Sequence, residues 1–175
     1  MESLAYLDVL LLLLVVSFFT IVQSFFGVGL LVFGTPTLLL IGYSFPETLS
    51  YLLPASIIVS FLQVYNSWDN VTLYRKNVIL FMLPMVGLGL LLILFIFDLS
   101  LYLAIGSMLL LTSLARFSNS LNESLELYLS SNFKFGFIVT GFIHGLTNLG
   151  GAPLVIITNG IYKSKKNIQA NIAYA

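Results

Sequence analysis

The feature that most constrains the fold is a long stretch without charge near the start of the chain. No charged residue occurs between Asp8 and Glu47. A single membrane-spanning helix needs roughly 20 apolar residues, so this stretch has about twice the length of one. Only 8% of the 175 residues are charged, whereas soluble domains carry about 25%. The sequence therefore predicts an all-α, polytopic transmembrane helical bundle embedded in a lipid bilayer.

Composition excludes several classes of function. Seven basic and seven acidic residues cancel, which leaves no basic face for nucleic acid. The absence of cysteine excludes disulfides, thiolate metal sites and cysteine nucleophiles. Apart from Asp8 near the start of the first apolar block, no carboxylate falls inside such a block, and the common hydrolase and nucleotide motifs are absent. We expect a protein that is not an enzyme and uses no cofactor or metal, with a membrane enzyme built around His144 as a minor alternative.

Polar segments divide the chain into five apolar blocks. The blocks are Leu4–Tyr43 (interrupted at Gln23–Gly29), Leu49–Tyr65, Val78–Phe97, Leu99–Leu114 and Phe133–Tyr162. A tight turn is expected at Asp98. The polar segment after the fourth block has leucines near helical spacing, which suits a helix lying at the membrane interface. We expect a first transmembrane repeat over residues 1–118, a connecting loop over 119–132 and the start of an incomplete second repeat over 133–175.

Two glycine-rich segments of the chain are similar to each other. Gly27–Gly42 and Gly145–Gly160 both contain a Gly-x-Pro motif followed by an apolar run that ends in glycine. Apolar segments interrupted by Gly and Pro at corresponding places indicate the binding site of a transporter. The alternative is that Gly and Pro are simply common in membrane helices.

Basic residues mark the cytoplasmic loops of membrane proteins. Arg75, Arg116 and Lys163–Lys166 would then all lie inside, so Phe133–Tyr162 must enter and leave on the same side. Its length of about 30 residues is too short for two full spans of roughly 20 residues each, and we expect a broken, re-entrant pair of half-helices. The same shape in Leu4–Tyr43 would place the N-terminus outside, giving inverted-topology repeats. Whether the first limb of that block crosses completely stays open.

A helix broken inside the membrane exposes N–H groups at the start of each half-helix, which favours anions. The candidate substrate-binding residues lie at and around the two breaks: Gln23, Gly27, Gly29, Gly34, Pro36, His144, Gly145, Thr147, Asn148, Gly150, Gly151 and Pro153. We read this set as a site for a small oxyanion. His144 could relay a proton or contact substrate, or could be a neutral imidazole bonded between helices. Gln23 could donate to an anion or join two helices.

The two segments resemble the signature repeats of the sulfite exporter TauE/SafE family of transporters. The second motif matches at Gly145, Leu146, Thr147, Gly150, Gly151, Pro153 and Leu154. The first matches at Gly27, Gly29 and Pro36, with Leu30 and Leu31 in place of two glycines. The resemblance implies a multi-pass inner-membrane (plasma-membrane) protein. It also implies export of sulfite or organosulfonates driven by a proton or another ion.

Members of that family are usually longer than this chain, so the sequence is expected to be the front part of a longer protein. The alternative to a transporter is therefore a non-transporting fragment or half-module. Such a half-module would need further C-terminal helices or a partner chain to complete its second repeat.

Overall fold

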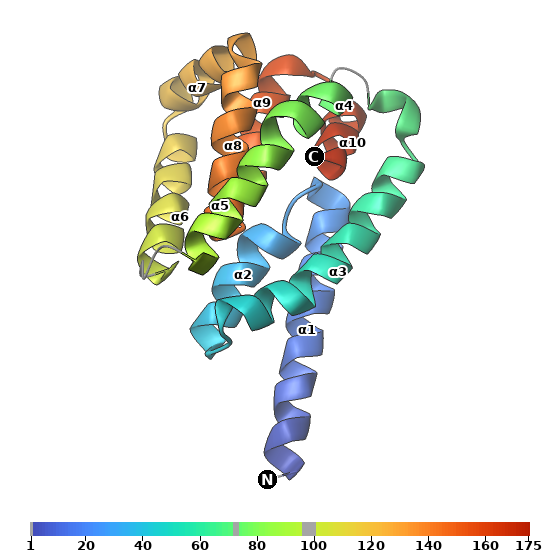
Figure 1. Ribbon diagram of the computed structural model, residues 1–175. Coiled ribbons are helices and arrows are strands. Elements are labelled where there is room, and N and C mark those ends of the chain that lie inside the picture. The colour runs from blue at the N-terminus through green and yellow to red at the C-terminus, as the bar shows by residue number, and fades with distance from the viewer. Residues whose placement is uncertain (1, 72–73, 96–100) are drawn as a thin grey trace.

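A computed structural model describes residues 2–71, 74–95 and 101–175. This part of the chain is 89% helical and without strands, which confirms the predicted all-α class (Figure 1). The elements are α1 Glu2–Phe26, α2 Leu30–Ile41, α3 Phe45–Tyr65, the 3₁₀ turn η1 Trp68–Asn70, α4 Tyr74–Asn77, the π-helical turn η2 Val78–Met82, α5 Leu83–Phe95, α6 Leu101–Phe117, α7 Asn119–Ser131, α8 Phe133–Thr147, α9 Gly151–Ile161 and α10 Lys165–Tyr174. The turn predicted at Asp98 lies outside the described residues.

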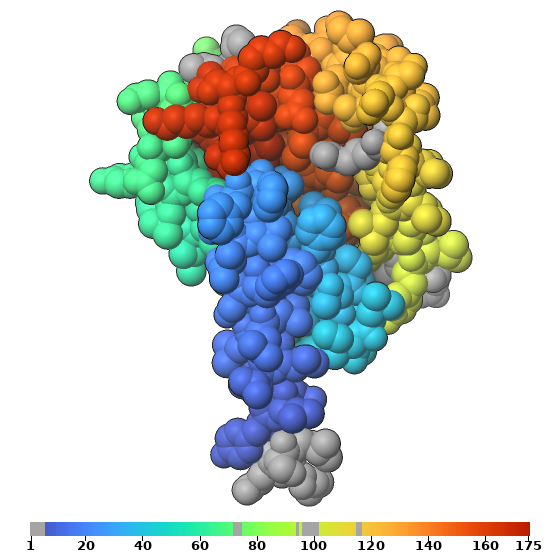
Figure 2. All heavy atoms as spheres, turned by 180° about the vertical axis from the view of Figure 1, so that it is seen from behind, coloured from blue at the N-terminus to red at the C-terminus, as the bar shows by residue number. Residues whose placement is uncertain are grey.

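Three helical stretches are long and apolar enough to cross a membrane. They are Tyr6–Phe26, Phe45–Tyr65 and Arg75–Ile93, the last formed by α4, η2 and α5 together. Large apolar side chains on all three face outward, where lipid can cover them. The N-terminal half of α1 extends well beyond the rest of the molecule (Figure 2). The three helices agree with a multi-pass membrane protein.

The first predicted interruption lies between α1 and α2. Gly27 there has a φ of +81°, a left-handed conformation that residues with a side chain rarely adopt. Helix α10 covers the turn closely, because a Cβ atom on Gly27 would lie 3.4 Å from the Cα atom of Gln169. Glycine at this position therefore allows both the reversal of the chain and the approach of α10.

The second predicted interruption separates α8 from α9. Helix α8 ends in a left-handed cap at Asn148, whose φ is 61°. Asparagine is a residue that accepts this conformation at a helix C-terminus. The N–H of Leu149 donates to Oγ1 of Thr147 over 3.2 Å, which satisfies one donor inside the turn. Both breaks expected from the sequence are thus present.

The two broken pairs point in opposite directions. The outer ends of α1 and α2 lie toward the end of the molecule that carries the N-terminus, whereas α8 and α9 open toward the opposite end (Figure 1). The pairs contact each other near their breaks, because Nδ2 of Asn148 in the second break donates to Oγ1 of Thr35, in the middle of α2, over 2.9 Å, and both side chains are buried. This is the arrangement expected of inverted-topology repeats. The first limb, α1, is a continuous helix of 25 residues and has the length of a full span.

Glycines hold α8 tightly against η2 and α5. A Cβ atom would lie 2.2 Å from the carbonyl oxygen of Val86 if added to Gly145, and 2.4 Å from that of Met82 if added to Gly141. Small residues of this kind let the backbones of membrane helices approach each other. The contact therefore holds the last turns of α8, just before the second break, against α5.

Basic residues gather at one end of the molecule. Helix α4 carries Arg75 and Lys76, and α10 begins with Lys165 and Lys166. Both helices lie at the end where α7 packs, opposite the connection between α2 and α3 (Figure 1). Helix α7 occupies the segment predicted as a connecting loop, so this connection is largely helical. Positive residues on one side favour a cytoplasmic position for that end.

Labelling of single cysteines tests this orientation, because the natural chain contains no cysteine. Glu47→Cys is expected to react with a membrane-impermeant thiol reagent added outside intact cells. Lys165→Cys is expected to react only after the membrane is opened. Reaction of both positions from the same side would contradict the proposed inverted arrangement.

Candidate functional site

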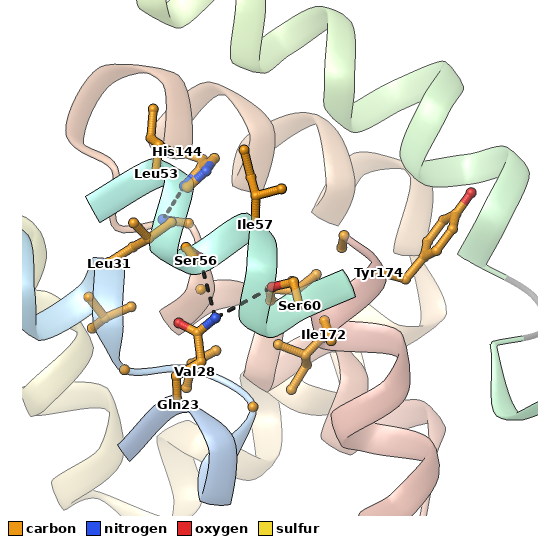
Figure 3. Close-up of a pocket in the computed structure, with 18 of the residues that line it drawn as sticks. Gln23, Val28, Leu31, Leu53, Ser56, Ile57, Ser60, His144, Ile172 and Tyr174 are labelled. Carbon is orange, nitrogen blue, oxygen red and sulfur yellow. Dashed lines mark hydrogen bonds between the residues drawn. The ribbon is translucent and has the colours of Figure 1, made fainter. Parts of the chain in front are cut away.

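A cavity of about 260 Å³ lies where the two breaks meet (Figure 3). Helices α1, α2, α3, α8, α9 and α10 and the turn η2 contribute to its wall. Most lining side chains are apolar, and the polar ones are Gln23, Ser56, Ser60, His144 and Tyr174. The cavity therefore combines an apolar wall with a few polar groups, as binding sites for small molecules commonly do.

Gln23 joins three elements at the first break. Its Oε1 accepts the N–H of Leu30, the first residue of α2, over 3.2 Å. Its Nε2 donates to Oγ of Ser56 over 3.3 Å and to Oγ of Ser60 over 3.4 Å, both on α3. Gln63 adds support from α3, because its Nε2 donates to the carbonyl oxygen of Gln23 over 3.1 Å. Gln23 thus acts as the link between helices that the sequence suggested, while it also lines the cavity.

His144 has the corresponding place at the second break. Its Nδ1 accepts the N–H of Gly150 over 3.2 Å, so a neutral His144 carries its proton on Nε2. This approach requires a glycine, since a Cβ atom on Gly150 would lie 2.4 Å from the Cβ atom of His144. In each break, a side chain one to two turns upstream therefore binds the N–H group at the start of the second half-helix.

Several donors at the cavity wall have no acceptor within the described part of the protein. The N–H groups of Leu31, Val32 and Gly151 lie in the first turns of α2 and α9, where no upstream carbonyl is available. The hydroxyl groups of Ser56 and Ser60 accept from Gln23 and donate to no described carbonyl. The site therefore presents N–H and O–H donors beside the positive ends of two helix dipoles.

The structure separates the predicted site residues into three groups. Those that line the central cavity are Gln23, Gly27, Gly29, His144, Gly150 and Gly151. Gly145 and Asn148 line a second cavity of about 80 Å³, which His144 and Leu53 also border. The remaining four, Gly34, Pro36, Thr147 and Pro153, line neither of these cavities.

The two Gly-x-Pro motifs occupy different depths in their half-helices. Pro36 lies inside α2, six residues after its start at Leu30, whereas Pro153 lies two residues after the start of α9 at Gly151. Proline is easily accommodated in a first turn, where its missing N–H has no partner to lose. When the two repeats are aligned by the hydrogen bonds of Gln23 and His144, Leu30 corresponds to Gly150. This alignment differs from the one that places Pro36 opposite Pro153.

Sequence reasoning missed Ser56 and Ser60. They are four residues apart on α3 and so share one face of that helix. Two hydroxyl residues on one face of an apolar span were a usable signal. What the spacing could not show is that this face of α3 packs beside Gln23.

The family model for sulfite exporter TauE/SafE matches residues 12–173, which is nearly the whole chain. The chain belongs to the sulfite exporter TauE/SafE family. This confirms the resemblance noted in the two glycine-rich segments. No curated protein and no solved structure matches the chain. Members of the TauE/SafE family are membrane transporters rather than enzymes, so this TauE/SafE protein is a membrane transporter and not an enzyme.

Proposed function

We propose that this protein exports a small sulfur-containing oxyanion, such as sulfite or an organosulfonate, across the plasma membrane, and that the substrate binds in the central cavity. The observation that carries the proposal is the meeting of two half-helix N-termini around one cavity. Unsatisfied N–H groups and the helix dipole together make such termini favourable for anions. The opposed orientation of the two pairs brings both termini to the same ligand.

The side chains on the wall support an anionic ligand of small size. Ser56 and Ser60 can each donate a hydroxyl hydrogen, and His144 can donate from Nε2. No aspartate or glutamate side chain lines the cavity, so no negative side chain on its wall opposes an anion. The oxygens of sulfite or a sulfonate group are acceptors that match this set of donors.

The second cavity adjoins the central cavity and suggests a path for the substrate. It lies against Phe45 and Leu49 near the start of α3, and it shares Leu53 and His144 with the central cavity. These two shared side chains therefore stand between the cavities. A transporter of this design would move substrate past Leu53 and His144 when the two broken pairs shift relative to each other.

Equilibrium binding of radiolabelled sulfite to the purified protein tests the site. The double variant Ser56→Ala/Ser60→Ala removes both hydroxyl donors. Hydrogen bonds to a charged group contribute about 1.5–3 kcal/mol each, so we expect sulfite binding to weaken at least about tenfold. Ser113→Ala is the control, because Ser113 lies on α6, which contributes no residue to the wall of the central cavity.

Equal affinity in the wild type and the double variant would place the substrate elsewhere. An equal loss in Ser113→Ala would also contradict the assignment, since it would show that the effect does not depend on the cavity. The proposed substrate class would be overturned if the wild type bound none of the four anions sulfite, sulfate, sulfoacetate and thiosulfate.

A further inference from the structure

The same kind of hydrogen bond is made at both breaks, but the side chains that accept it differ in chemistry. An acceptor atom on Gln23 or on His144 binds the N–H group at the start of the following half-helix, over 3.2 Å in both cases. A glutamine side chain does not titrate, whereas an imidazole changes its charge near neutral pH. Since Gln23 makes this contact at the first break, the contact itself does not require a histidine at the second.

The hydrogen bond at His144 excludes one protonation state. The N–H of Gly150 can only donate, so Nδ1 must be unprotonated while this contact exists. A proton on Nδ1 would place two N–H groups against each other. The proton and the Gly150 amide therefore compete for the same lone pair.

Fixed positive side chains are missing from the wall around His144. The elements that share its two cavities are α1, α2, α3, η2, α5, α8, α9 and α10, and none contributes a lysine, arginine, aspartate or glutamate to either lining. The other titratable side chain there is that of Tyr174. An anion buried without a counter-charge is costly, and an anion nearby favours the charged form of an imidazole.

We propose that His144 takes up one proton when the anion binds, so that the proton and the anion occupy the central cavity together. The anion accepts the N–H of Gly150, which frees Nδ1, and Nδ1 then takes up one proton from water. The imidazolium donates to the anion, so one proton accompanies each bound anion and offsets one negative charge. This inference rests on the proposed function, because it needs an anion in the central cavity.

The only histidine of the chain makes the test direct. Protein with isotope-labelled imidazole nitrogens gives one pair of ring signals, and NMR distinguishes the neutral Nε2–H form from the imidazolium. At a fixed, mildly alkaline pH we expect the neutral form without ligand and the imidazolium at saturating sulfite. A signal that stays neutral while radiolabelled sulfite is bound would overturn the inference. Absence of binding of sulfite, sulfate, sulfoacetate and thiosulfate alike would instead overturn the proposed function.

His144→Gln provides a second measurement, since it places at the second break the residue type used at the first. We expect wild-type affinity for sulfite to rise as the pH falls, by up to about tenfold per pH unit when one proton binds with the anion. His144→Gln is expected to show only the dependence that comes from the titration of sulfite itself. Identical pH profiles for the two proteins would contradict proton binding at His144.

Discussion

Gly145→Val is expected to prevent stable folding of the protein. A Cβ atom at this position would lie 2.2 Å from the carbonyl oxygen of Val86 and 2.9 Å from the amide nitrogen of Leu90. Both are backbone atoms of α5, so relief requires the helices to separate. Overpacking a core costs about 1–3 kcal/mol, and more when the backbone must move. Since stabilities are about 5–15 kcal/mol, we expect a large loss of thermal stability in detergent, measured by size-exclusion chromatography after heating.

Gly87→Val is the matched control for this effect. Gly87 lies in α5, the helix that Gly145 of α8 contacts, but a Cβ atom on Gly87 has no heavy atom within 4 Å. The control should keep the thermal stability of the wild type to within a small margin. A Gly145→Val protein as stable as the control would show that α5 and α8 do not approach as closely as described.

Gly151→Leu is expected to abolish transport while the protein still inserts into the membrane. A Cβ atom at Gly151 would lie 3.0 Å from Cγ2 of Val32 and 3.1 Å from Cγ1 of Val28. A leucine side chain would therefore press against α2 and enter the cavity where the two breaks meet. Flux of radiolabelled sulfite through proteoliposomes should fall to the level of protein-free vesicles.

The control for Gly151→Leu is Gly106→Leu on α6, where a Cβ atom meets only open space. This variant should retain wild-type flux, which would show that an added leucine does not by itself disturb transport. Wild-type flux in Gly151→Leu would refute the placement of the substrate path at the breaks.

The sequence made the breaks predictable because each one places glycine inside an otherwise apolar run. Gly27 and Asn148 adopt the left-handed conformations that end α1 and α8, and His144 stood out as the one histidine. The opposed pairs expected from charge placement agree with the directions of α1–α2 and α8–α9 in the structure (Figure 1). These features depend on local sequence or on charge alone.

Other parts of the site could not be predicted, because they depend on contacts between distant segments. Ser56 becomes part of the site only because α3 packs beside Gln23, 33 residues earlier in the chain. The bond between Asn148 and Thr35 spans 113 residues. The proline motifs suggested one register for the repeats, whereas the hydrogen bonds at the breaks give another. These features depend on how side chains pack between helices, and no local sequence pattern indicates that packing.

Flux of radiolabelled anions from proteoliposomes that contain this protein tests most directly whether it transports a small sulfur oxyanion. Sulfite, sulfate, sulfoacetate and thiosulfate would be compared, with protein-free vesicles as the baseline and insertion confirmed by cysteine labelling. We expect saturable flux of sulfite or sulfoacetate that unlabelled sulfite inhibits. Correctly inserted protein that moves none of the four anions would contradict this expectation, and would favour a half-module that needs a partner chain.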